Sequence, residues 1–267
     1  MPYYRAVGEM PAKRHLQFRR EDGRLFTEEL MGVEGFSSDS SLLYHRHAPT
    51  TLVRAELVAD SPYPATKPNA PLLPRHFRTQ SLEVPSGGGN LVEDRVLLAS
   101  NADVRISHAV ADVDSPMYRN AIGDEMVYIV SGTAVLESVF GTLAVGPGDY
   151  VNVPTSTTHR WTVAGPEPVR ALVIEASGHI RPPKHFLSQY GQFLERAPYS
   201  ERDLRVPEGP LLAETDEETW VLVRHQRGIT RYLYAHHPFD VVGWDGCLYP
   251  FAFSIHDYEP TVKRTHL

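Results

Sequence analysis

The clearest hydrophobic pattern in the chain is a series of short apolar runs between residues 120 and 161. The runs are rich in Val and Tyr and are separated by turn-forming residues such as Ser131-Gly132 and Pro147-Gly148-Asp149. Short apolar runs between glycine turns are typical of consecutive antiparallel strands. The pattern predicts strands at residues 126–130, 134–136, 143–145 and 150–153. A small β-barrel or jelly roll accounts for such a series, so we expect a mainly all-β fold.

Further elements are predicted on both sides of this stretch. Residues 13–19 alternate polar and apolar side chains, which predicts a first edge strand, and residues 75–79 are expected to lead into another strand. Aromatic residues at helical spacing predict one helix within residues 185–196. Five prolines between residues 61 and 74 predict an extended crossing loop. The remaining predicted strands are residues 95–99, 104–109, 170–175 and 220–224.

Composition limits the cellular setting and the partners. The 267 residues carry a formal charge of −7, and no long basic run is present, which argues against a nucleic-acid partner. No apolar stretch reaches the eighteen residues of a membrane span, and the amino terminus lacks a hydrophobic signal core. The single cysteine, Cys247, excludes internal disulfides. We therefore expect a cytoplasmic protein with no membrane partner.

The spacing of Glu125, Gly132, Gly148-Asp149 and His159 resembles the two sequence motifs of the cupin family. In metal-binding cupins a His-x-His pair, the Glu and the later His hold a divalent metal. Here the positions seven and five residues before Glu125 are Tyr118 and Asn120. We therefore expect a cupin-type jelly-roll barrel without metal, in which Glu125 and His159 are vestigial ligand positions that line the barrel and bond each other or water.

Longer phrases resemble the homogentisate 1,2-dioxygenases, in particular their bacterial branch. They are E-E-L-M-G at residues 28–32, G-F-S-S-D-S-S-L-L-Y-H at 35–45, P-L-L-P-R-H at 71–76 and H-P-F-D-V-V-G-W-D-G-C-L-Y-P-F at 237–251. The resemblance implies two related β-barrel halves, the first without metal and the second holding Fe(II). It also implies opening of a homogentisate-like aromatic ring with O2 in tyrosine and phenylalanine catabolism, and a homo-oligomer, either a trimer or a hexamer.

The resemblance implies a division of the chain into two regions. Residues 1–219 would form the metal-free cupin-like barrel with its amino-terminal strands, and residues 220–267 would begin the catalytic half. After Trp244 no His is followed at family spacing by a Glu and a second His, so no iron ligand can be assigned. We expect the 267-residue chain alone to be inactive, either as the amino-terminal portion of a longer dioxygenase or as a shortened relative.

Three residues of the last phrase are candidates for the substrate site. Some members of the family carry a catalytic His directly after the Trp, where this chain has Asp245. A carboxylate can accept the same proton, although an unperturbed pKa near 4 makes it a weaker base at neutral pH than an imidazole near 6.5. A turn residue before Gly246 is an equal alternative. Trp244 and Tyr249 are candidates for the pocket wall.

Two observations leave alternatives open. His45 and His47 lie two positions apart, and on a strand they would share one face, but no third ligand stands at a suggestive spacing; a surface or subunit-contact role is expected. Glu125 and His159 also suit an acid and a base, so a single-barrel cupin isomerase or epimerase is a second hypothesis. A non-catalytic binding or assembly module is a third.

Overall fold

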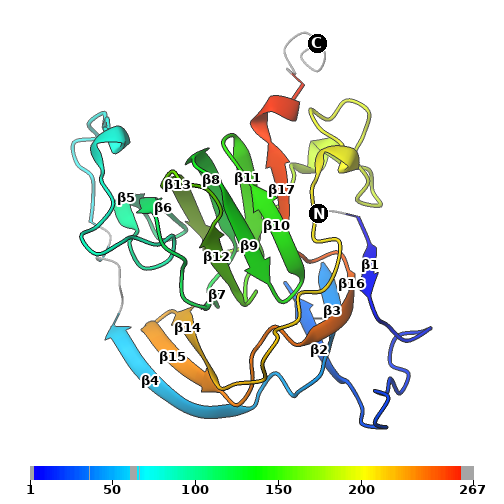
Figure 1. Ribbon diagram of the computed structural model, residues 1–267. Helices are drawn as coiled ribbons and strands as arrows, with labels where there is room; N and C mark the ends of the chain where they lie inside the picture. Colours follow the sequence, from blue (N-terminus) through cyan, green and yellow to red (C-terminus); the bar gives the residue numbers. More distant parts are fainter. Residues whose placement is uncertain (1–2, 36, 61–64, 66, 260–267) are drawn as a thin grey trace.

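The computed structural model describes residues 3–35, 37–60, 65 and 67–259, and strands dominate it (Figure 1). A six-stranded sheet has the order β17-β11-β8-β13-β6-β5. Its strands are β5 (Val96–Ser100), β6 (Val104–Ala111), β8 (Glu125–Ser131), β11 (Asp149–Val153), β13 (Val169–Ala176) and β17 (Phe251–Ser254).

A seven-stranded sheet faces it, in the order β10-β9-β12-β7-β14-β15-β4. Its strands are β4 (Leu52–Asp60), β7 (Tyr118–Asn120), β9 (Ala134–Ser138), β10 (Gly141–Val145), β12 (His159–Val163), β14 (Thr219–His225) and β15 (Gly228–Tyr234). A four-stranded sheet in the order β1-β16-β3-β2 flanks the barrel; it comprises β1 (Arg5–Gly8), β2 (Thr27–Gly32), β3 (Ser40–His45) and β16 (Val241–Gly246).

The prediction of an all-β, cupin-type jelly roll is confirmed. Strands β8 to β11 cover the four predicted runs, because Gly132, Gly141 and Gly148 supply the positive φ values that the tight turns between them require. The helical elements in the described part of the chain are three-residue 3-10 turns. They are η1 (Thr79–Ser81), η2 (Lys184–Phe186), η3 (Glu201–Asp203) and η4 (Ile255–Asp257).

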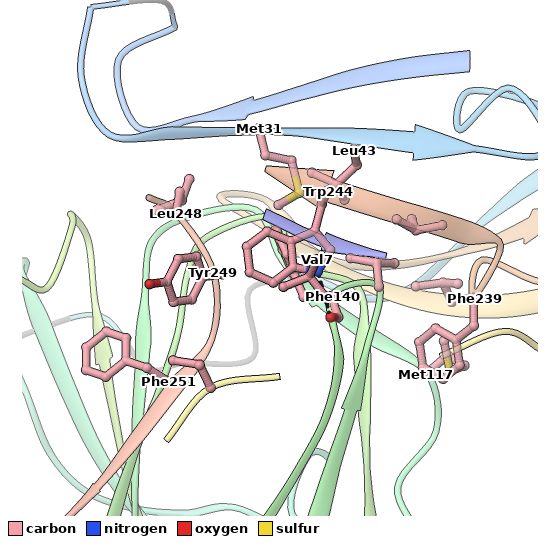
Figure 2. Packing of buried hydrophobic residues seen from close by; sticks show 14 of the residues in the cluster. Val7, Met31, Leu43, Met117, Phe140, Phe239, Trp244, Leu248, Tyr249 and Phe251 are labelled. Carbon is pink, nitrogen blue, oxygen red and sulfur yellow. Dashed lines mark hydrogen bonds between the residues drawn. The ribbon is translucent and has the colours of Figure 1, made fainter. Parts of the chain in front are cut away.

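Two of the three hydrophobic clusters in the described residues contain most of the buried side chains. The first fills the barrel with inward side chains of both sheets, among them Ile129, Leu136 and Trp161. The second lies between the barrel and the four-stranded sheet, where Trp244, Phe140 and Tyr249 pack together (Figure 2). The Trp244 indole N–H donates to the Phe140 carbonyl at 2.9 Å, which ties β16 to the β9–β10 turn.

The strands after residue 219 pair with strands that precede it. β14 runs parallel to β7, β15 is antiparallel to β4, and β17 is antiparallel to β11. A domain boundary between residues 219 and 220 stays a prediction, since a sheet can be shared by two halves of a longer architecture.

Three predicted elements are wrong. Residues 13–19 contain only an isolated bridge from Arg19 to Leu25, because His15 has a φ of 61° and bends the chain; the first strand is β1. Residues 185–196 form the short turn η2 rather than a helix, since Gly191, with a φ of 82°, reverses the chain so that Leu187 bridges Phe193. Residues 75–79 lead into η1 and not into a strand.

The predicted proline-rich loop is partly observed. Residues 61–64 and 66 lie outside the described residues, and the described remainder up to residue 74 contains no strand or helix.

Candidate functional site

Two glutamates face each other inside one end of the barrel. Glu125 on β8 and Glu175 on β13 are cross-strand partners, and both are buried. Like charges directly opposite destabilise a sheet unless they are compensated. Arg95 compensates them: its Nη1 and Nη2 donate to Glu125 at 3.1 and 2.9 Å, and its Nη1 reaches Glu175 at 3.2 Å. Arg224 on β14 forms a second ion pair with Glu175.

Tyr118 and Asn120, which stand at the two positions where metal-binding cupins have histidines, also donate hydrogen bonds to Glu125. The Tyr118 hydroxyl donates to its Oε1 at 2.8 Å and the Asn120 amide donates to the same atom at 2.9 Å. Burial alone would raise the pKa of Glu125, but the charge and hydrogen bonds of Arg95, with the Tyr118 bond, lower it to about 2. Glu125 is therefore an ionised, fully engaged carboxylate. Its partners are Arg95, Tyr118 and Asn120, and no hydrogen bond joins it to His159 among the described residues.

His159 lies beside this network as a neutral imidazole. Its Nδ1 lies 2.9 Å from the Thr157 carbonyl oxygen, and its Nε2 is buried without a hydrogen-bond partner in the described structure. Burial lowers the pKa of His159. The Tyr118 ring packs edge-on against it at 5.5 Å between centroids. His159 is thus a core histidine in contact with the tyrosine that replaces a ligand.

The barrel end does not fit Fe(II). A catalytic ferrous ion commonly needs two imidazoles and a carboxylate with open positions. This end of the barrel offers one imidazole, and the guanidinium of Arg95 already neutralises Glu125. A second positive charge beside that guanidinium would be repelled. The absence of a metal from the barrel stays a prediction.

The three candidate substrate residues lie in the second core or at its edge. Trp244 is fully buried, and the Tyr249 hydroxyl donates to the Tyr3 carbonyl at 2.6 Å. The Oδ2 atom of Asp245 accepts from the Tyr4 hydroxyl and from Arg14 Nε at 2.7 Å. Its Oδ1 atom is buried without a hydrogen-bond partner in the described structure. Their roles toward substrate stay predictions.

A large cleft lies elsewhere, with a volume of about 730 Å³. Its wall comes from the loop before β2, the segment after β3, the loop before β14 and the segment before β16. It is rich in charge, with the arginines Arg19, Arg20, Arg24 and Arg46 and several carboxylates. Asp240 lines both this cleft and a small neighbouring cavity that reaches Arg119 and Thr158.

His45 is buried in a charged cluster beside the cleft, so the expected surface or contact role is wrong for it. Its Nδ1 lies 2.7 Å from Asp240 Oδ1, and its Nε2 lies 3.0 Å from Glu29 Oε2. Burial lowers the pKa of His45, but these two carboxylates outweigh burial and raise it to about 9. His45 is therefore an imidazolium that holds Asp240 in place.

The His47 side chain contacts two residues, Asp216 and His236, that the spacing of residues in the sequence did not predict as its neighbours. Its Nε2 lies 3.0 Å from Asp216 Oδ2, and its ring stacks on that of His236 at 4.5 Å between centroids. One potential ligand atom from each of His47, Asp216 and His236 lies within 4.8 Å of the others. The sequence gives only weak signals for these two residues: His236 directly precedes the family phrase that opens at His237, and Asp216 lies in an acidic segment.

Comparisons with known proteins agree with this fold. A model of the cupin domain matches residues 110–175. The chain is 35% identical over 270 residues to the protein named "Putative dioxygenase SSO1533" of Saccharolobus solfataricus, covering 100% of this chain and 67% of that protein. It is 24% identical over 192 residues to homogentisate 1,2-dioxygenase of Caenorhabditis elegans, covering 68% of this chain and 42% of that enzyme.

Among solved structures, an RmlC-like cupin protein of Desulfovibrio desulfuricans is similar with a TM-score of 0.33 and 15% identity, covering 41% of this chain and 100% of that one. From the fold, the motifs and the full-length match, the chain belongs to the family of cupin-type dioxygenases. It spans about two thirds of the Saccharolobus protein and less than half of the nematode enzyme. Every helix in the described residues is too short to cross a membrane.

Proposed function

We propose that this chain provides the metal-free cupin barrel of a homogentisate 1,2-dioxygenase-type enzyme, which opens an aromatic ring with O2 in tyrosine and phenylalanine catabolism. The observation that carries the proposal is the ion pair between Arg95 and Glu125, which lies where a metal-binding cupin holds its cation. A first barrel without metal is what the resemblance to these dioxygenases implies. The similarity to a dioxygenase over the whole chain supports the same assignment.

In this proposal the barrel acts as a scaffold, and Fe(II) is bound by residues outside it. Trp244, Asp245 and Tyr249 are the residues proposed to form part of the substrate site. The Oδ1 atom of Asp245 is buried and has no hydrogen-bond partner in the described structure, while its Oδ2 atom accepts from Tyr4 and Arg14. A cytoplasmic location also belongs to this proposal.

The outer edge of the seven-stranded sheet supports a homo-oligomer, with a trimer or hexamer proposed from the resemblance. Among the described strands β4 pairs only with β15, and it exposes Leu52, Val53, Leu57 and Val58. An exposed apolar edge strand is a site at which another chain can pair. Light scattering of the purified protein measures the subunit number, and a monomer at micromolar concentration contradicts this part of the proposal.

The activity is tested with homogentisate, ferrous ion and O2, following oxygen consumption and the near-ultraviolet absorbance of the ring-opened product. We expect no turnover from residues 1–267 alone, and turnover with one O2 per homogentisate from a protein that also contains the proposed iron-binding half. Turnover by residues 1–267 overturns the scaffold role. If such a protein leaves homogentisate unchanged but opens the ring of another dihydroxybenzene, the proposed substrate is wrong and the assignment as a dioxygenase is retained.

The geometry does not favour an isomerase or epimerase that uses Glu125 and His159 as its base and acid. Both side chains are about 1% exposed, and neither lines the cleft or the small cavity. The strong pairing of Glu125 with Arg95 also makes it a poor base, since its pKa is lowered to about 2. A His159→Ala variant distinguishes an isomerase from a scaffold or binding module. The substitution abolishes the activity of an isomerase, whereas it only reduces the stability of a scaffold or binding module.

A further inference from the structure

The side chains of His47, Asp216 and His236 come together from three distant segments. His47 and Asp216 line the large cleft, and His236 lines the small neighbouring cavity. His47 follows β3, Asp216 precedes β14, and His236 follows β15. The pairing of β15 with β4 places Tyr234 opposite Leu52, and the Ala235 N–H donates to the Thr51 carbonyl at 3.2 Å. This register brings the end of β15 beside the residues before β4, so the two imidazoles stack because of a fixed strand pairing.

The His47 imidazole has a nitrogen available as a ligand. Its Nε2 lies 3.0 Å from Asp216, and its Nδ1 is buried, lies 3.4 Å from Asp240 and makes no hydrogen bond in the described structure. A neutral imidazole has one N–H and one lone pair. In the neutral ring that a metal ion binds, one of the two nitrogens presents a lone pair within the cluster.

The His236 imidazole is placed in a similar way. Its Nδ1 lies 3.1 Å from the His237 carbonyl oxygen, and its Nε2 lies 3.2 Å from the Ala48 carbonyl oxygen. Only one nitrogen of a neutral ring can donate, so the other faces a carbonyl oxygen with its lone pair. In the neutral ring that lone pair is the one that can bind an ion.

Two carboxylates supply the charge. Asp216 contacts His47 directly, and its side chain is 59% exposed, so it can move toward an incoming ion. Asp240 lies behind the histidines: its Oδ2 accepts from the His47 backbone N–H at 2.8 Å and lies 4.0 Å from His236 Nδ1. Carboxylates that orient ligating imidazoles from behind are the usual support of a metal site.

We propose that His47, Asp216 and His236 bind one divalent transition-metal ion at the edge of the cleft, with Asp240 orienting the imidazoles. Two imidazoles and a carboxylate suit Zn²⁺, Co²⁺ or Fe²⁺ better than Mg²⁺ or Ca²⁺. The ligand atoms now lie within 4.8 Å of one another. Metal bonds of about 2.0–2.2 Å require them to approach by roughly 1 Å, which movement of the exposed Asp216 side chain helps to supply.

This site is distinct from the barrel end, where Arg95 occupies the place of a cation. It also goes beyond the proposed dioxygenase, because binding at the cleft requires no ring cleavage. The two proposals can therefore fail separately.

Titration of the metal-free chain with Co²⁺ tests the site, read out by the visible d–d absorption of the ion and by calorimetry. We expect one Co²⁺ per chain, displaced by Zn²⁺. Asp216→Asn and His236→Gln should each weaken binding at least about tenfold, and Asp240→Asn should weaken it about 10–100-fold as a supporting carboxylate. Glu217→Gln is the matched control, since this exposed neighbour lies outside the cluster and its loss should leave binding unchanged.

The proposal is overturned if the metal-free chain shows no stoichiometric Co²⁺ site, or if Asp216→Asn and His236→Gln bind as tightly as Glu217→Gln. The latter result would assign the bound ion to other surface histidines. Circular dichroism of each variant checks folding. Asp216→Asn is informative even if His236→Gln fails to fold, because Asp216 is exposed and the substitution keeps its shape.

Discussion

Arg95 and Glu125, thirty positions apart, meet inside the barrel through two N–H···O contacts of 3.1 and 2.9 Å. The arginine precedes β5, and the glutamate begins β8. The guanidinium thereby supplies, from the chain itself, the positive charge that a cupin without this arginine can take from a metal ion. A buried carboxylate requires such a partner, because an isolated charge in the interior is strongly unfavourable.

Replacing Arg95 with Met should destabilise the protein severely. Glu125 and Glu175 would remain buried and opposite each other without the cation between them. Removing one partner of a buried ion pair costs about 3–5 kcal/mol, and we expect a loss in this range from urea unfolding. Arg160→Met is the control: its pair with Glu137 is partly exposed and should contribute at most about 1 kcal/mol. Equal losses in the two variants would contradict the scaffold role of Arg95.

The same network predicts how stability depends on acid. The pKa of Glu125 in the folded state is about 2, below its ordinary value of 4.5, so the unfolded chain binds a proton first as the pH falls. The contribution of Glu125 is therefore complete above about pH 4.5 and disappears as the pH approaches 2. We expect the difference in unfolding free energy between the wild type and Glu125→Gln to be flat from pH 5 to 8 and to shrink below pH 4.5. A difference that does not change across this range would argue against an ionised Glu125.

Gly132 should tolerate no side chain. Its φ is 77°, and a Cβ there would lie 2.7 Å from the Pro168 carbonyl oxygen. Gly191 has a similar φ of 82° but nothing within 4 Å of such a Cβ. We expect Gly191→Ala to cost about 1–2 kcal/mol from backbone strain, and Gly132→Ala to cost a further 1–3 kcal/mol, roughly, from overpacking. Thermal unfolding of the two variants measures the difference, and equal melting temperatures would show that the β8–β9 turn adapts.

Asp245 can be tested separately as a base and as an anchor. In a protein that also contains the proposed iron-binding half, Asp245→Asn should reduce kcat for homogentisate at least about 100-fold if the carboxylate accepts a proton. Arg14→Gln removes the cationic partner of the 2.7 Å ion pair and leaves the Asp245 carboxylate in place, so kcat should fall much less. If the two variants change kcat and stability equally, Asp245 only binds the amino-terminal segment and does not act as a base.

Much of the barrel can be predicted from the sequence. The alternation in β8 to β11 and the glycines between them depend on residues only a few positions apart. The absence of the cupin histidines can also be recognised there, because Tyr118 and Asn120 stand at fixed distances from Glu125. Local patterns mislead where one residue overrides them, as His15 and Gly191 do with their positive φ values.

Only the tertiary structure decided what fills the barrel end and what surrounds His47. Arg95 and Glu175 lie beside Glu125 although they are distant in the sequence, and Arg224 pairs with Glu175 from a further strand. Asp216 and His236 lie beside His47 across 169 and 189 positions. Contacts between residues so far apart in the sequence follow from strand order and register, as in the pairing of β15 with β4. Register is set by the burial of whole sheet faces, which no local stretch of the sequence contains.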